Sequence, residues 1–140
     1  MMNGSNAGTS GVDHVGLTVR NLDVTRRFFC DCLGWSVFGE KPDYPASFVT
    51  DGTARVTLWQ TEDPETSIGF DRRRNLGLHH LALRVATLEA LHALYLRISD
   101  WPDAEIEFAP EPSGGGPRIH FMIREPGGLR LEFVCHPTSG

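Results

Sequence analysis

Two histidines and one glutamate in this chain have the types and spacing of a metal-ligand set. His14 and His80 occupy the same place in two similar segments, DHVGLTVRNLDV and HHLALRVATLEA, and Glu132 lies in the late alternating segment LRLEFV. Two imidazoles and one carboxylate can bind a divalent ion and leave coordination positions open for a substrate. The sequence therefore predicts one divalent metal ion held by His14, His80 and Glu132.

The repeat that contains the two histidines also predicts the domain organisation. Its copies, at residues 13–24 and 79–90, are separated by close to half of the 140-residue chain. Two such copies indicate two similar modules, and modules this small are expected to share a core. We expect one domain at 12–136, made of module one at 12–60, a linker at 61–77 and module two at 78–136, with tails at 1–11 and 137–140.

Each module is expected to contain one strand, one helix and three further strands. Alternating apolar residues predict strands at 12–20, 35–39, 47–50 and 55–60 in module one, and at 78–85, 105–108, 119–124 and 129–134 in module two. Asp23 is expected to cap a helix that ends near Leu33, and Thr87 to cap a second helix that reaches Ile98.

Side-chain alternation gives each strand an apolar face and a more polar one. The apolar face, which includes Leu17, Leu83 and Leu131, is expected to pack under the helices. The polar face carries the three predicted metal ligands and also Thr57. His79 has the opposite parity from His80, so we expect it to face the helices in a structural role.

Composition excludes several classes of partner. The net charge of −5 and the lack of a basic stripe argue against nucleic acid, and the run Arg72–Arg74 is expected to be a solvated part of the linker. No apolar run is long enough to span a bilayer, so no membrane partner is expected. The N-terminus lacks the features of a secretory signal, and the three cysteines are expected to be reduced thiols, which together predict a cytoplasmic protein.

With these motifs, the chain resembles the vicinal oxygen chelate superfamily of glyoxalases, bleomycin-resistance proteins and extradiol dioxygenases. The resemblance rests on DHVGLTV, HHLALRV, FFCDCLGW and EPGGLRLEF and covers nearly all of 12–136. It implies an α+β fold in which two βαβββ modules form a cupped mixed sheet with the helices on the outer face. It also implies metal ligands at His14, His80 and Glu132, and it places Thr57 at the fourth ligand position.

Threonine at that fourth position bears on the reaction. Enzymes similar to glyoxalase I commonly have a carboxylate there, and those similar to methylmalonyl-CoA epimerase have an amide, whereas Thr57 is a poor ligand. A His-His-Glu set is instead similar to extradiol dioxygenases or to enzymes that inactivate fosfomycin, although Met122 and Gly16 depart from the residues that those enzymes often carry. The resemblance therefore implies either dioxygenase-like or lyase/isomerase-like chemistry.

The expected substrate is a small molecule that binds the metal through two adjacent oxygens. Two neutral histidines, one carboxylate and a divalent ion leave a charge of about +1, which favours an anionic bidentate ligand. His120 is a candidate general acid or base, with a second-sphere or surface role as the alternative. Thr57, Trp59, Phe48 and Arg130 are expected to line the substrate pocket. The expected metal is a divalent ion of Fe, Mn, Zn, Ni or Co, and the sequence does not choose among them.

The sequence leaves open two other functions and two locations of the metal site. Trp59 and Phe48 also suit a metal-free protein of the bleomycin-resistance type that binds a drug or metabolite, and a purely structural module is the third reading. We expect a homodimer, because proteins similar to this one often pair and two-fold dimers are common. The resemblance allows a metal site within one chain or across two chains.

Overall fold

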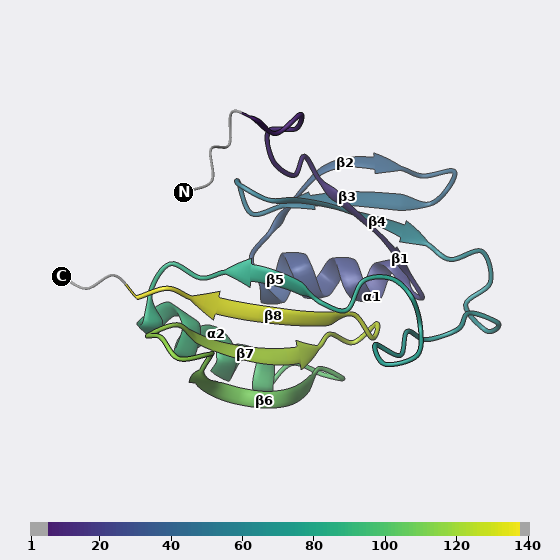
Figure 1. Cartoon of the computed structure of the whole chain (residues 1–140). Coiled ribbons are helices and arrows are strands. Elements are labelled where there is room, and N and C mark those ends of the chain that lie inside the picture. The colour runs from purple at the N-terminus through teal and green to yellow at the C-terminus, as the bar shows by residue number, and fades with distance from the viewer. Residues whose placement is uncertain (1–5, 138–140) are drawn as a thin grey trace.

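The computed structural model describes residues 6–137 and contains two βαβββ modules (Figure 1). Module one consists of β1 (Val15–Val19), α1 (Leu22–Arg27), the π-helical turn η2 (Phe28–Cys32), β2 (Ser36–Lys41), β3 (Ala46–Thr50) and β4 (Arg55–Gln60). Module two consists of β5 (Leu81–Arg84), α2 (Leu88–Ser99), β6 (Glu105–Pro112), β7 (Ile119–Arg124) and β8 (Arg130–Cys135). The predicted tails at 1–11 and 137–140 fall partly outside the described residues.

The strands form two four-stranded sheets of the same topology. The strand orders are β1-β4-β3-β2 and β5-β8-β7-β6, and in each sheet the first pair is parallel and the others are antiparallel. The predicted α+β fold with two βαβββ modules is thus confirmed. Within the described residues β1 and β5 do not pair, so the eight strands are not joined into one hydrogen-bonded sheet.

The two helices begin at side-chain caps. The carboxamide of Asn21 accepts the Val24 N–H at 3.2 Å, so the predicted cap at Asp23 is wrong by two residues. Asp23 lies in the first turn, where its carboxylate pairs with Arg26 and Arg27. The predicted Thr87 cap is confirmed, since its hydroxyl accepts the Ala90 N–H at 3.0 Å. Neither helix in the described residues has the length and apolar character needed to cross a bilayer.

One core joins the two modules through their helix-covered sides. The same cluster of buried side chains includes Leu17 and Leu58 of module one and Leu131 and Phe133 of module two. Figure 1 shows α1 between the two sheets, and α2 covers the lower one. The opposite face of each sheet lacks a helix, and we call it the helix-free face.

Glu125 connects the turn between β7 and β8 to α1. Its carboxylate is only 2% exposed and accepts the Thr25 hydroxyl at 3.1 Å, the Gly127 N–H at 2.8 Å and the Leu129 N–H at 3.1 Å. Burial raises the pKa of this carboxyl above its usual value of 4.5, against the opposing effect of the three hydrogen bonds. Glu125 is therefore part of the contact that fixes module two against module one.

Glu125→Ala is expected to lower the free energy of unfolding by about 3 kcal/mol, because three donors lose their acceptor at a site with little water. Urea unfolding followed by circular dichroism measures this loss. Glu62→Ala, which removes an exposed loop carboxylate, is the matched control and is expected to change stability by less than about 0.5 kcal/mol. Equal stability of the two variants would contradict the bridging role of Glu125.

The raised pKa also gives the sign of a pH dependence. The folded chain holds the Glu125 proton more tightly than the unfolded chain, so this stabilisation is complete below pH 4.5 and is lost as the pH rises through the folded-state value. Glu125→Gln keeps the shape of the side chain but does not titrate. The stability of wild type relative to Glu125→Gln is therefore expected to fall as the pH rises through this window.

Candidate metal centre

Three ligand-type side chains meet on the helix-free face of module two. The Glu132 carboxylate on β8 lies 3.0 Å from His80 Nε2 through Oε1 and 2.6 Å from His120 Nδ1 through Oε2. The side chains of Glu132 and His120 are 14% and 16% exposed, and that of His80 is 33% exposed. Two imidazoles are thus held against one carboxylate in a half-buried position. We call these three residues the His-Glu-His cluster.

Strand register makes Thr57 and Glu132 equivalent positions. Thr57 pairs with Gly16, two residues after His14, and Glu132 pairs with Ala82, two residues after His80. Each parallel pair therefore places a histidine of the leading segment beside the same position of the last strand of its module. The module-one copy of this arrangement has a hydroxyl where module two has a carboxylate.

The neighbours of His80 fix its tautomer. Arg130 only donates hydrogen bonds, so His79 Nδ1, which lies 3.1 Å from the Arg130 guanidinium, must accept. His79 Nδ1 also lies 2.8 Å from His80 Nδ1, which must then be the donor. With its proton on Nδ1, His80 directs Nε2 at Glu132, and a neutral ring presents a lone pair there. This is the tautomer that a metal ligand needs.

His14 is arranged in the same way in module one. Its Nδ1 lies 2.7 Å from the Asp13 carboxylate, and this hydrogen bond lowers the pKa of Asp13. The Asp13 carboxylate accepts a hydrogen bond from the Nδ1–H of His14, so Nε2 of His14 is the nitrogen available to a metal ion. Asp13 and His79 occupy equivalent places in the repeat, so each module uses the residue before its histidine to orient the ring.

The spacing within the cluster fits a cation. A bare His80 Nε2 and an ionised Glu132 oxygen present two lone pairs to each other at 3.0 Å, an arrangement that requires a proton or a cation between or beside them. Adjacent donors at right angles around an ion with bonds of about 2.1 Å lie about 3.0 Å apart. The residues present therefore fit two neighbouring ligands of a divalent ion.

The predicted ligand set is only partly brought together within one chain. His80 and Glu132 are in contact, but His14 belongs to the other sheet and its ring contacts Asp13. Across residues 6–137, no group of three or more His, Cys, Asp or Glu side chains is placed so that it could hold a metal ion. The predicted set of His14, His80 and Glu132 is therefore not assembled within one described chain.

Thr57 lies in an aromatic environment on the helix-free face of module one. The residue is 7% exposed, and its hydroxyl accepts the Trp59 indole N–H at 2.8 Å. The Trp59 ring lies 5.5 Å from Phe48 and 4.7 Å from Tyr44 between ring centres, and the Lys41 ammonium lies 5.9 Å from the Trp59 ring. Trp59 and Phe48, both predicted as pocket residues, therefore belong to one aromatic wall beside Thr57.

Two predictions about individual side chains need correction or extension. His79 does not face the helices: β5 begins only at Leu81, so strand alternation does not apply to residue 79, and its exposed ring contacts His80. Desolvation, and then the Arg130 charge, lowers its pKa. Arg130, predicted as a pocket residue, is held by two hydrogen bonds to Glu107, one of them at 2.9 Å. Sequence reasoning missed Asp13 and Glu107, and the position before each repeat histidine was the available signal for Asp13.

Comparison with known proteins supports the fold and the family. Residues 11–133 match the family model described as Glyoxalase/Bleomycin resistance protein/Dioxygenase superfamily. A curated relative, catechol-2,3-dioxygenase of Bacillus subtilis (strain 168), is 28% identical over 115 residues, which are 74% of this chain and 39% of the relative. The chain therefore spans about two fifths of the length of this relative.

Solved structures show the same architecture. A glyoxylase/bleomycin resistance protein/dioxygenase domain from Frankia sp. EAN1pec is 26% identical, with a TM-score of 0.76 over 95% of this chain and 96% of that one. The fosfomycin resistance protein FosX from Listeria monocytogenes is 15% identical, with a TM-score of 0.70 over 91% of this chain and 94% of that one. The second likeness shows the fold alone.

Proposed function

Because the chain belongs to the glyoxalase, bleomycin resistance protein and dioxygenase superfamily, we propose that it is a divalent-metal-dependent enzyme that binds a small substrate through two adjacent oxygens. The observation that carries this proposal is the contact of Glu132 with His80 and His120. His80 Nε2 and Glu132 Oε1 lie at the spacing of two neighbouring ligands of an Fe, Mn, Zn, Ni or Co ion, and the His80 tautomer suits such a ligand. A bound ion would polarise the two substrate oxygens and stabilise the anion that forms.

The residues of the chain have separate roles in this proposal. His80 and Glu132 would hold the ion together with His14, while Asp13 and His79 keep the two histidines in the required tautomer. His120 donates a hydrogen bond from its Nδ1–H to Glu132, and this bond orients the carboxylate. Nε2 of His120 is then left to exchange a proton with the substrate. Thr57, too weak a ligand to bind the ion directly, leaves a position open for a substrate oxygen.

The aromatic wall favours a flat substrate with an apolar body. Phe48 and Tyr44 both contact the Trp59 ring, so the three rings form one aromatic surface. A flat substrate ring could stack against such a surface. A charge of about +1 on the metal and its ligands favours an anionic chelating group. An aromatic or conjugated vicinal diol fits both features, and catechol, from which the dioxygenase relative takes its name, is such a diol. Lyase or isomerase chemistry on a vicinal hydroxy-carbonyl compound remains the second reaction type.

We further propose that the active unit is a homodimer with shared sites. His14 has a half-exposed side chain and precedes β1 of one sheet, whereas His80 precedes β5 and Glu132 lies on β8 of the other sheet. A two-fold partner that lays its module one over module two of the first chain would bring the three ligands together twice. Thr57 and the aromatic wall of the partner would then cover the cluster.

A metal-free binding protein is the alternative function. It is favoured by the aromatic wall, which needs no metal to hold a flat apolar ligand, and by the incomplete ligand set in one chain among the described residues. In this alternative the His-Glu-His cluster is a hydrogen-bonded polar patch. A purely structural role would leave the tautomer arrangement of His80 and the aromatic wall unexplained.

The test is a screen of metals against substrates on protein purified without chelator. Catechols, hemithioacetals, 2-oxo acids and fosfomycin with thiols are tested with each of the five metals, with and without oxygen. Metal content of about one ion per chain, with turnover of one substrate class that chelator abolishes and one metal restores, supports the proposal. Tight binding of an aromatic ligand without metal uptake or turnover would support the alternative instead.

A further inference from the structure

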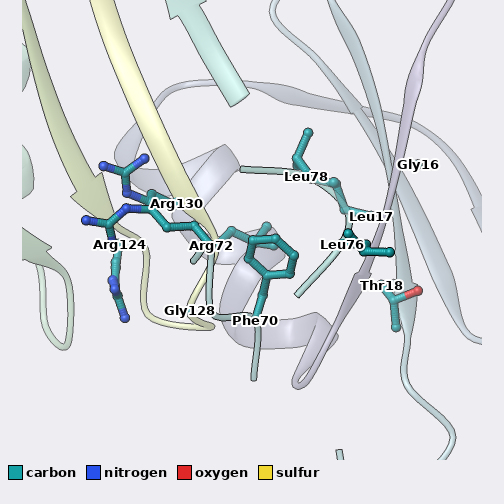
Figure 2. Close-up of a pocket in the computed structure, with 11 residues that line it drawn as sticks. Gly16, Leu17, Thr18, Phe70, Arg72, Leu76, Leu78, Arg124, Gly128 and Arg130 are labelled. Atoms are coloured by element: carbon teal, nitrogen blue, oxygen red, sulfur yellow. The ribbon is translucent and has the colours of Figure 1, made fainter. Parts of the chain in front are cut away.

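A cavity of about 450 Å³ lies outside the His-Glu-His cluster, between the linker, β1 and the turn that leads into β8. Its apolar side is formed mainly by Leu17, Phe70, Leu76, Leu78 and Leu129, and its other side carries three arginines, Arg72, Arg124 and Arg130. In Figure 2 the three guanidinium groups gather on the left, Leu17, Leu76 and Leu78 stand on the right and the Phe70 ring lies between them. The volume is in the range of small-molecule sites.

The linker forms a defined wall of this cavity. The carbonyl of Asp71 accepts the Asn75 N–H at 2.8 Å and its carboxylate accepts the Arg73 N–H at 2.9 Å, which closes a tight turn. Arg20 holds the preceding segment through the Ser67 hydroxyl at 2.8 Å. This turn places Arg72 in the cavity wall, so the predicted solvated role of the arginine run does not hold for Arg72.

Two of the three arginines of the cavity place like charges opposite each other in the sheet. Arg124 and Arg130 stand directly opposite each other on β7 and β8, a position in which like charges destabilise a sheet. Glu107 neutralises Arg130 through its two hydrogen bonds. Among the described residues, Arg72 and Arg124 form no ion pair within 4.0 Å, although Glu105 stands opposite Arg124 on β6 and both Glu105 and Glu107 line the neighbouring depression. Two guanidinium groups are thus left to face an anion.

We propose that this cavity binds a small organic anion with an apolar body, with its carboxylate, sulfonate or phosphate head on Arg72 and Arg124. Guanidinium groups bind such heads through two parallel hydrogen bonds, and the leucine and phenylalanine side takes the apolar part of the ligand. Arg130, already paired with Glu107, connects the cavity to His79, one residue from the cluster. The proposal does not depend on a metal-dependent reaction.

The test uses octanoate as the probe and isothermal titration calorimetry on the full chain. Octanol has the same apolar body without the charge, and inorganic phosphate has charge without the body. Octanoate is expected to bind with one site per chain and at least about tenfold more tightly than either control, since a charge-assisted hydrogen bond and a buried apolar body each contribute that much.

Matched variants locate the site. Arg72→Met and Arg124→Met keep the length of the side chain, and each is expected to weaken octanoate binding by about tenfold. Arg73→Met, next to Arg72 but outside the cavity lining, is expected to bind octanoate as wild type does. Equal affinity of octanol and octanoate, phosphate binding as tight as octanoate binding, or wild-type affinity in both cavity variants would each overturn the proposal. Because the titration needs no turnover, its failure is separate from failure of the enzymatic proposal.

Discussion

Glu132→Ala and His80→Ala are each expected to weaken binding of a divalent ion by more than about 100-fold, because loss of a direct ligand exceeds the 10- to 100-fold cost of losing an outer partner. Both variants remove a donor from the only pair of predicted ligands that lie in contact within one described chain. Competition against a fluorescent chelator measures the affinity. His14→Ala is expected to behave in the same way, as the third ligand of a site completed by a second copy.

Three further variants are expected to affect metal affinity less than loss of a direct ligand does. His92→Ala, on the exposed side of α2, is the control and is expected to leave metal affinity unchanged. His79→Ala and Asp13→Ala remove only the acceptor that orients a ligand ring, so they are expected to lose about 10- to 100-fold. If His92→Ala and Glu132→Ala bound metal equally well, the cluster would not be a metal site.

Thr57→Glu is expected to tighten metal binding by about tenfold or more, because a fourth protein ligand with an ionised oxygen joins the ion. Gly16 pairs with Thr57, whose hydroxyl occupies the space that a side chain on Gly16 would take, and the Trp59 indole N–H is already placed to donate to an oxygen there. The added carboxylate removes about one unit of positive charge and one open position. Binding of an anionic bidentate substrate and the native turnover are therefore expected to fall.

Thr57→Gln is the control that separates the effect of the added charge on metal affinity from the effect of the larger side chain. It has the shape of the glutamate variant without its charge, so it is expected to lose turnover through crowding but to gain little metal affinity. Calorimetric titration of the metal into both variants makes the comparison. Unchanged metal affinity, anion affinity and turnover in Thr57→Glu would place residue 57 outside the site.

Much of the fold could be predicted from periodicity because strands such as β1, β5 and β8 have one buried face. Leu17, Leu83 and Leu131 alternate with polar residues and lie in the core as expected. The family resemblance implied a fourth ligand position at Thr57, and the strand register makes Thr57 equivalent to Glu132. The Thr87 cap followed from local chemistry alone. These features depend on neighbours in sequence or on strict alternation, so one sequence was sufficient.

The features that were missed depend on contacts distant in sequence. Whether Asn21 or Asp23 caps α1 depends on where the strand before it ends, which alternation does not fix. The orientation of His79 depends on the start of β5 and on Arg130, 51 residues away. The buried role of Glu125 arises from its contact with Thr25, 100 residues away, and the turn of the linker places Arg72 in a cavity. No pattern of neighbouring residues predicts such contacts.

The mixed dimer of His14→Ala with Glu132→Ala tests the shared metal site most directly. Each homodimeric variant lacks a ligand in both sites, whereas the mixed dimer, with His14 intact in one chain and Glu132 in the other, would regain one complete site of two. Metal content is measured on the mixed dimer isolated through two affinity tags. We predict about one tightly bound ion per dimer, half of the wild-type content, with none in either homodimer. A mixed dimer without metal, alongside a wild type that binds it, would contradict a site shared between chains.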